Sequence, residues 1–173
     1  ELSLEMLENF NPCFVLDLTA TPKKESNIIS YVDAVQLKNE HMVKLPVIVY
    51  NRDSQSEVLI DAIDLRNKLE EIASAEYTKT GKYIRPIALF QAQPKGKEDA
   101  TTFEKLRDKL VDAGIPAEQI AIRTADVNEL KNVDLQSPDC PIRYIITVNA
   151  LKEGWDCPFA YILASLANKT SQV

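Results

Sequence analysis

The sequence contains few of the residues from which metal sites and hydrolytic triads are built. It has one histidine, His41, and three widely spaced cysteines, Cys13, Cys140 and Cys157, with no Cys-x-x-Cys pair. A disulfide framework or a zinc site is therefore not expected, and cysteine usage of this kind fits an intracellular protein. His41 lies in a polar stretch and is interpreted as a surface residue. A chain with one histidine offers few groups for a histidine-based catalytic triad and cannot form a His-rich metal site.

Long apolar runs, a basic excess and a phosphate loop are also missing. No segment approaches the roughly 18 consecutive apolar residues of a membrane helix, so no membrane partner is expected. The net charge of -6 argues against an autonomous nucleic-acid binder, although it allows a local contact within a larger groove. Neither Gly81-Lys82 nor Gly96-Lys97 continues into Gly-Lys-[Ser/Thr], so any triphosphate would be held by residues outside this sequence.

The apolar residues of the sequence and their spacing predict an α/β domain. Hydrophobic residues make up 45% of the chain, which is enough for a core. Apolar residues at helical spacing predict helices over 54–77, capped by Ser54 or Ser56 and followed by Gly81, and over 97–113. Short apolar runs predict strands over 11–18, 43–50, 84–92, 119–123, 142–148 and 159–166. Alternating strands and helices favour a mainly parallel sheet with helices on both faces.

Unusual polar stretches follow the predicted strands, where ligands of parallel sheets bind. Thr19-Ala20-Thr21 is either a hydroxyl-rich functional turn or a strand end capped by local hydrogen bonds. The amides of Gln91 and Gln93 either contact a ligand or nucleic-acid backbone, or are ordinary polar residues that leave a strand.

The stretch TVNALKEGWDCP, residues 147–158, leaves two interpretations open. In one, Gly154 allows a close backbone approach to phosphates, and Asp156 accepts hydrogen bonds from a ribose. In the other, the stretch is a turn in which Trp155 caps the core and Asp156 makes a local bond.

Together these stretches resemble superfamily 2 helicases, as represented by the restriction subunit of type III restriction enzymes. FVLDLTATPK, residues 14–23, resembles helicase motif III, and VKLPV, residues 43–47, resembles the entry into the second motor domain. IALFQA, residues 87–92, is placed like the motif IV strand, and NALKEGWDCP, residues 149–158, is similar to motif V.

The resemblance implies a RecA-like, P-loop NTPase-type three-layer fold. Residues 1–40 would end a first RecA-like domain and form a linker, and residues 41–173 would form the second domain, truncated before motif VI. Because the chain begins with Glu1, we expect it to be a piece of a longer protein.

The resemblance also assigns roles to individual residues, with no complete catalytic set and no metal ligands. The motif III-like residues would couple hydrolysis to movement: Thr19, Ala20 and Thr21. The motif V-like residues would face the nucleotide: Glu153, Gly154 and Asp156. Three residues would face DNA: Thr147, Asn149 and Gln91.

The activity implied for the parent protein is ATP-dependent DNA translocation or unwinding, with type III site-specific DNA cleavage as a further possibility. Its cofactors would be ATP and Mg²⁺, held mainly outside this sequence. Its partners would be DNA, the first RecA-like domain and a methyltransferase subunit, in the bacterial cytoplasm. The alternative is a non-catalytic α/β interaction or scaffold module of a DNA-processing complex, because a fold alone does not fix function.

Overall fold

The computed structural model describes residues 6, 9–19, 22, 27–40, 42–43, 47–94, 101–148 and 156–166. The chain divides into two compact units, Glu1–Val49 and Tyr50–Val173. Each unit is described by itself below.

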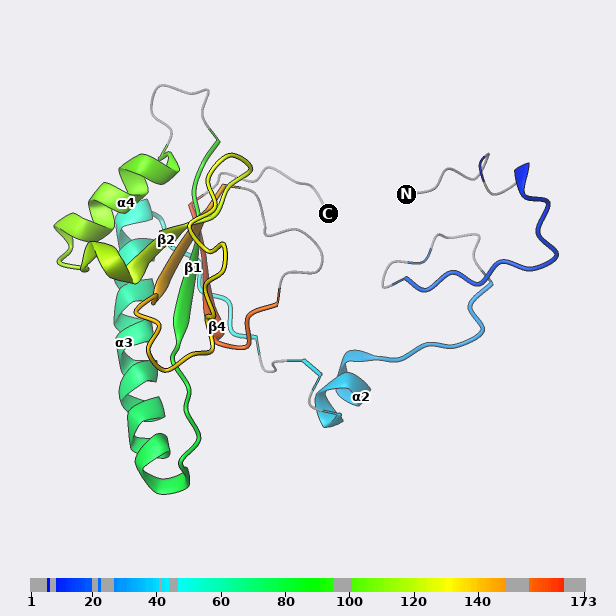
Figure 1. Ribbon diagram of the computed structural model, residues 1–173, viewed down its shortest axis with the longest axis horizontal. Helices are drawn as coiled ribbons and strands as arrows, with labels where there is room; N and C mark the ends of the chain where they lie inside the picture. Colours follow the sequence, from blue (N-terminus) through cyan, green and yellow to red (C-terminus); the bar gives the residue numbers. More distant parts are fainter. Residues whose placement is uncertain are drawn as a thin grey trace. The chain divides into compact units, whose positions relative to one another are not determined.

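The second unit is built on a sheet of four parallel strands. They are β1 (Ile87–Gln91), β2 (Ile120–Ile122), β3 (Tyr144–Thr147) and β4 (Ala160–Ser165), in the order β2-β3-β1-β4. All three neighbouring pairs are parallel, which confirms the predicted parallel α/β sheet (Figure 1). Strands β1, β2 and β3 are apolar and buried along most of their length, as expected for strands that are covered on both faces, whereas buried and exposed residues alternate along most of the edge strand β4. This architecture is compatible with a RecA-like fold.

Helix α3 (Gln55–Thr80) confirms the longest predicted helix, with Ser54 as its cap and Gly81 after its end, and it runs three residues past the predicted end at Tyr77. Ser54 accepts a hydrogen bond from the Glu57 backbone at 3.2 Å, and the Glu57 carboxylate accepts one from the Ser54 backbone at 3.4 Å. This reciprocal capping box satisfies two helix-terminal donors. Gly81 ends the helix with φ +73°, a left-handed conformation that side chains disfavour.

Helix α4 (Phe103–Asp112) packs on the same face of the sheet as α3. Thr102 caps its start, and Leu106 and Leu110 are buried in one core with Leu59 and Ala62 of α3. Both helices lie to one side of the strands (Figure 1). The prediction of helices on both faces is therefore not met by the described residues, which form two layers rather than three.

The opposite face is covered by loops in part only. A second core holds Ile87, Ile145 and Cys157, with Leu130 and Leu135 of the β2–β3 connection packed against it. That connection follows the 3-10 turn η1 (Ala117–Gln119) and β2, and it is made of turns and bends. Farther out on this face, the Leu163 side chain of β4 is 70% exposed.

In the first unit, Ala34–Asn39 form the short helix α2. The strand predicted over 11–18 is wrong, because these residues form no strand and Phe14 and Leu18 are 74% and 89% exposed. The same holds for the described part of the strand predicted over 43–50. A strand requires a partner to satisfy its backbone groups, and the described residues of this unit offer none.

Candidate functional site

The carboxyl edge of the sheet carries a row of four polar side chains: three lie at the ends of β3, β1 and β4, and one directly follows β2. In register, Gln91 of β1 stands beside Thr147 of β3 on one side and Ser165 of β4 on the other. Arg123 follows Ile122, the partner of Ile146, and its backbone N–H donates to the Ile146 carbonyl at 2.8 Å. The row is therefore Arg123, Thr147, Gln91 and Ser165, and it is called the polar row below.

The polar row faces away from the two helices. The residue before each of its members belongs to the helix-side core: Ile122, Ile146, Phe90 and Ala164. Because side chains alternate along a strand, the row itself lies on the helix-free face. Thr147 is 3% exposed and Gln91 is 8% exposed, whereas Arg123 is half-buried and Ser165 is exposed. The inner members are thus enclosed, and the outer members reach the surface.

A hydrogen bond orients the amide of Gln91. The Ser165 hydroxyl donates to Oε1 of Gln91 at 3.0 Å. This bond fixes the carbonyl side of the amide and leaves its nitrogen as the remaining donor. Amide and guanidinium donors at the carboxyl end of a parallel sheet can bind the oxygens of a phosphate.

The helix side of the same edge has a separate network that joins elements of the fold. The Gln93 amide donates to the Leu166 carbonyl at 3.0 Å and accepts from the Thr101 backbone at 2.9 Å. The Thr101 hydroxyl donates to the amide oxygen of Gln55 at 2.7 Å. These bonds use both ends of the Gln93 amide, so its role here is to hold β4, α3 and the segment before α4 together.

The amino edge of the sheet differs in chemistry. Arg85 is 1% exposed, and its guanidinium donates to the Ser137 carbonyl at 2.8 Å, the Tyr83 hydroxyl at 3.1 Å and the Leu135 carbonyl. Backbone carbonyl dipoles therefore solvate this buried charge in place of a carboxylate, and these bonds fix the β2–β3 connection against the segment before β1.

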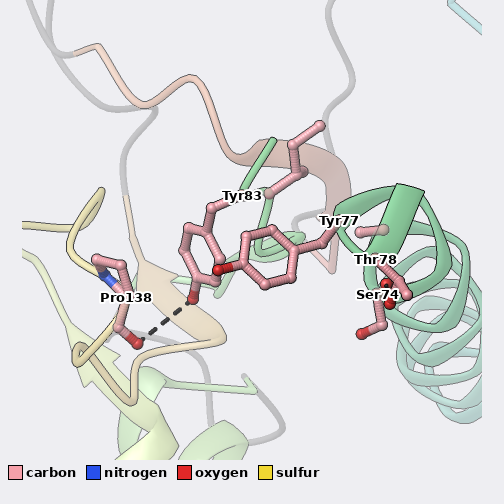
Figure 2. Close-up of a pocket in the computed structure, with 7 residues that line it drawn as sticks. Ser74, Tyr77, Thr78, Tyr83 and Pro138 are labelled. Carbon is pink, nitrogen blue, oxygen red and sulfur yellow. Dashed lines mark hydrogen bonds between the residues drawn. The ribbon is translucent and has the colours of Figure 1, made fainter. Parts of the chain in front are cut away.

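A cavity of about 420 Å³ opens beside Arg85 at this amino edge. Figure 2 shows Tyr83 between Pro138 and Tyr77 of α3. The Tyr83 hydroxyl donates a hydrogen bond to the Pro138 carbonyl. The two tyrosine rings meet edge to face with centroids 6.1 Å apart. Ser74 and Thr78 complete the polar part of the lining, which contains no charged side chain. The cavity therefore lies at the opposite end of β1 from the polar row.

Under α3, a charged cluster contacts the buried ring of Tyr144. The carboxylate of Glu70 accepts from Arg66 and, at 2.9 Å, from Arg143. The Arg66 guanidinium lies 5.3 Å from the ring centroid of Tyr144. Burial raises the pKa of the Tyr144 phenol above its usual value, and the neighbouring arginine charges oppose that rise.

The sequence-predicted site residues are placed as follows. Thr147 and Gln91 are brought side by side by the register. Asp156 is exposed and precedes Cys157, which packs against Ile87 near the amino edge, so it is not brought together with them. Thr19 lies in the first unit without regular structure. The remaining predicted residues lie outside the described ones: Ala20, Thr21, Asn149, Glu153 and Gly154.

Sequence reasoning did not identify Arg123 or Ser165 as members of the site. Each is the first polar residue after a short apolar run, which is the signal that singled out Gln91. Their shared row depends on the strand order and register, which no local pattern contains.

Comparison of the chain with family models, curated proteins and solved structures returned no match. No helix among the described residues is long and apolar enough to cross a membrane. The same residues contain no group of three or more His, Cys, Asp or Glu side chains suited to a metal ion.

Proposed function

We propose that this chain is the second motor domain of an ATP-dependent DNA translocase or helicase, similar to the restriction subunit of type III restriction enzymes. The observation that carries the proposal is the pairing of Gln91 with Thr147 at the carboxyl edge of a parallel sheet. Gln91 belongs to the motif IV-like stretch and Thr147 lies two positions before the motif V-like stretch, and both stand at the edge where α/β sheets bind ligands.

In this proposal the residues keep the roles that the resemblance implies. Thr147, Asn149 and Gln91 face DNA, and Glu153, Gly154 and Asp156 face the nucleotide. Contacts of this kind go mainly to phosphates, which position a protein on DNA without reading its sequence. Motif III-like Thr19, Ala20 and Thr21 couple the first motor domain to movement of the strand.

The described residues do not fit a complete site for ATP and Mg²⁺. The chain has no phosphate loop, and its described part has no carboxylate cluster for a metal. Phosphoryl transfer requires such groups to stabilise the charge on the transferring phosphoryl. We therefore propose that ATP and Mg²⁺ are held mainly by the first RecA-like domain, and that the chain alone does not hydrolyse ATP.

The decisive experiment measures DNA-stimulated ATP hydrolysis by the complete protein carrying Asp156→Ala. Loss of charged hydrogen bonds worth about 1.5–3 kcal/mol predicts a fall in kcat/KM of about 10- to 100-fold. Asp139→Ala, which removes an exposed carboxylate from the β2–β3 connection, is the matched control and is expected to be neutral. An unchanged rate in the Asp156 variant would favour the alternative, a non-catalytic interaction module.

The proposed partners follow from the same resemblance: DNA, the first RecA-like domain and a modification subunit, in the bacterial cytoplasm. Because the chain has a net charge of -6, long-range attraction of DNA would have to come from other regions. We therefore expect the chain to contribute local contacts to a larger DNA groove.

A further inference from the structure

Arg85 carries a positive charge that no carboxylate balances within the part of the chain that the structure describes. Its guanidinium donates to the Tyr83 hydroxyl at 3.1 Å and to the carbonyls of Ser137 and Leu135. Its Nε atom is buried and has no hydrogen-bond partner among the described residues. The Phe159 ring covers the guanidinium, with 5.9 Å between the guanidinium carbon and the ring centroid. Because dipoles lower the cost of a buried charge without cancelling it, a net positive charge remains behind Tyr83.

Tyr83 connects this buried charge to the cavity of about 420 Å³. Its hydroxyl oxygen accepts from Arg85, and its proton is directed to the Pro138 carbonyl at 3.5 Å (Figure 2). That distance is well beyond the usual value of about 2.7–2.8 Å for a hydroxyl donor, so the bond is weak and a stronger acceptor can replace it. A hydroxyl that accepts from a cation is polarised, which strengthens the bond that it makes to an anion.

The remaining walls of the cavity suit one aromatic ring. Tyr77 and Tyr83 meet edge to face with centroids 6.1 Å apart, and Ala73, Ile84 and Pro138 supply apolar surface. Aromatic rings favour edge-to-face and offset contacts with a further ring. The volume lies near the lower end of the range of about 300–1,000 Å³ that is usual for ligand pockets, which matches a ligand of one ring rather than a large cofactor.

Other charged side chains near the cavity do not offset Arg85. None belongs to the described lining. Two lysines, Lys79 and Lys82, and two acids, Glu76 and Asp139, are next to lining residues in the sequence. All four are exposed, so their charges are screened by solvent and salt, and together they sum to zero. The unbalanced charge that a ligand meets through Tyr83 is therefore that of Arg85, and it favours an anion.

We propose that this cavity binds a small aromatic carboxylate. The ring lies beside Tyr77 and Tyr83, and the carboxylate accepts a hydrogen bond from the Tyr83 hydroxyl in place of the Pro138 carbonyl. The ligand thereby supplies the negative charge that Arg85 lacks, and it contacts both α3 and the β2–β3 connection. The site lies at the opposite end of β1 from the polar row and is independent of the proposed motor function.

The test measures binding of sodium phenylacetate to the purified complete protein by ligand-observed nuclear magnetic resonance. We expect a Kd on the order of 1 mM, as is usual for a ligand of this size. Phenylacetamide has the ring without the charge, and acetate has the charge without the ring, so each is expected to bind about tenfold more weakly. Equal Kd values for phenylacetate and phenylacetamide, or no binding of phenylacetate up to about 20 mM, would overturn the proposal.

The variant Tyr83→Phe keeps the ring and removes the hydroxyl. It is expected to raise the Kd of phenylacetate about five- to tenfold and that of phenylacetamide less than about twofold, with an unchanged near-ultraviolet circular dichroism spectrum as the check of folding. Tyr161→Phe is the matched control, because it removes a tyrosine hydroxyl from β4 outside the cavity lining, and neither Kd should change. An unchanged phenylacetate Kd in Tyr83→Phe would show that the carboxylate does not contact this hydroxyl.

Two further measurements locate the carboxylate and identify the source of the ligand. If Lys82→Gln weakens phenylacetate binding as much as Tyr83→Phe does, an exposed lysine holds the carboxylate and the proposal is wrong. The peptide acetyl-Gly-Gly-Phe presents the same ring and carboxylate at a chain end. Weaker binding of this peptide than of phenylacetate supports a free acid as the ligand, whereas binding at least about tenfold tighter would assign the cavity to a peptide end instead.

Discussion

Apolar runs of similar composition form a buried strand in one unit of the chain and an exposed segment without strand structure in the other. FVLDL, residues 14–18, lies in Glu1–Val49 and is exposed without strand structure. IALFQ in Tyr50–Val173 is the central strand β1, with Phe90 at 0% exposure. The two runs have similar β propensity, so composition does not explain the difference.

The two runs differ in the strands that pair with them and in the helices that cover them. β1 pairs with β3 and β4 on its two sides, and α3 and α4 cover one of its faces. The run at 14–18 has no paired strand among the described residues of its unit. Burial and backbone hydrogen bonds therefore stabilise one run and not the other.

The largest expected difference between the units comes from removing one phenylalanine in each. Phe90→Ala should destabilise the second unit by about 3–5 kcal/mol, because it deletes a buried ring and leaves a cavity. Phe14→Ala should change the free energy of unfolding by less than about 0.5 kcal/mol, since the ring is exposed. Urea unfolding followed by circular dichroism measures both. A large loss in the Phe14 variant would show that the first unit has a core of its own.

A smaller effect is expected from the two capping boxes. Ser54→Ala should lower the free energy of unfolding of the second unit by about 1 kcal/mol, because α3 packs on the sheet and unfolds with it. Asp33→Ala breaks the same motif on α2, a six-residue helix with no buried residue. We expect no shift in the cooperative transition for that variant, and a comparable shift would contradict the independence of the two units.

The smallest effect is expected on the stability of the second unit at alkaline pH. Burial raises the pKa of Tyr144, so the folded state holds the phenol proton more tightly than the unfolded chain, whose tyrosine pKa is about 10. This contribution to stability is complete below about pH 10 and is lost as the pH rises through the raised value. Tyr144→Phe should therefore lose less stability than the wild type between pH 9 and 11, measured as the difference in urea midpoints. Parallel midpoint curves would contradict the shift.

The sequence predicted the second unit well and the first poorly. The boundaries of α3 are encoded locally, by Ser54 at one end and Gly81 at the other, so they were predictable. Strands β1, β3 and β4 were found as apolar runs, although each is shorter than predicted. The strand at 11–18 was wrong because pairing is a property of the partner, which a local run does not specify.

Some residues of the candidate site were also predictable from the sequence, and others were not. Gln91 and Thr147 could be identified because each ends an apolar run, while Arg123 could not be ranked above the other arginines. Among the described arginines that are not fully buried, it is the one without a carboxylate partner, and that follows from which acidic side chains the fold brings near each arginine.

By itself, the sequence determined the main element types of the second unit, the capping residues of α3 and the parallel character of the sheet, because these depend on periodicity, local capping and continuous apolarity within short segments. Only the tertiary structure decided the strand order β2-β3-β1-β4, the placement of both described helices on one face, and the polar row. These features arise from contacts between segments that are far apart in the chain. Arg123 and Gln91 are 32 positions apart (123 − 91), and the register of β3 between them sets their separation in space.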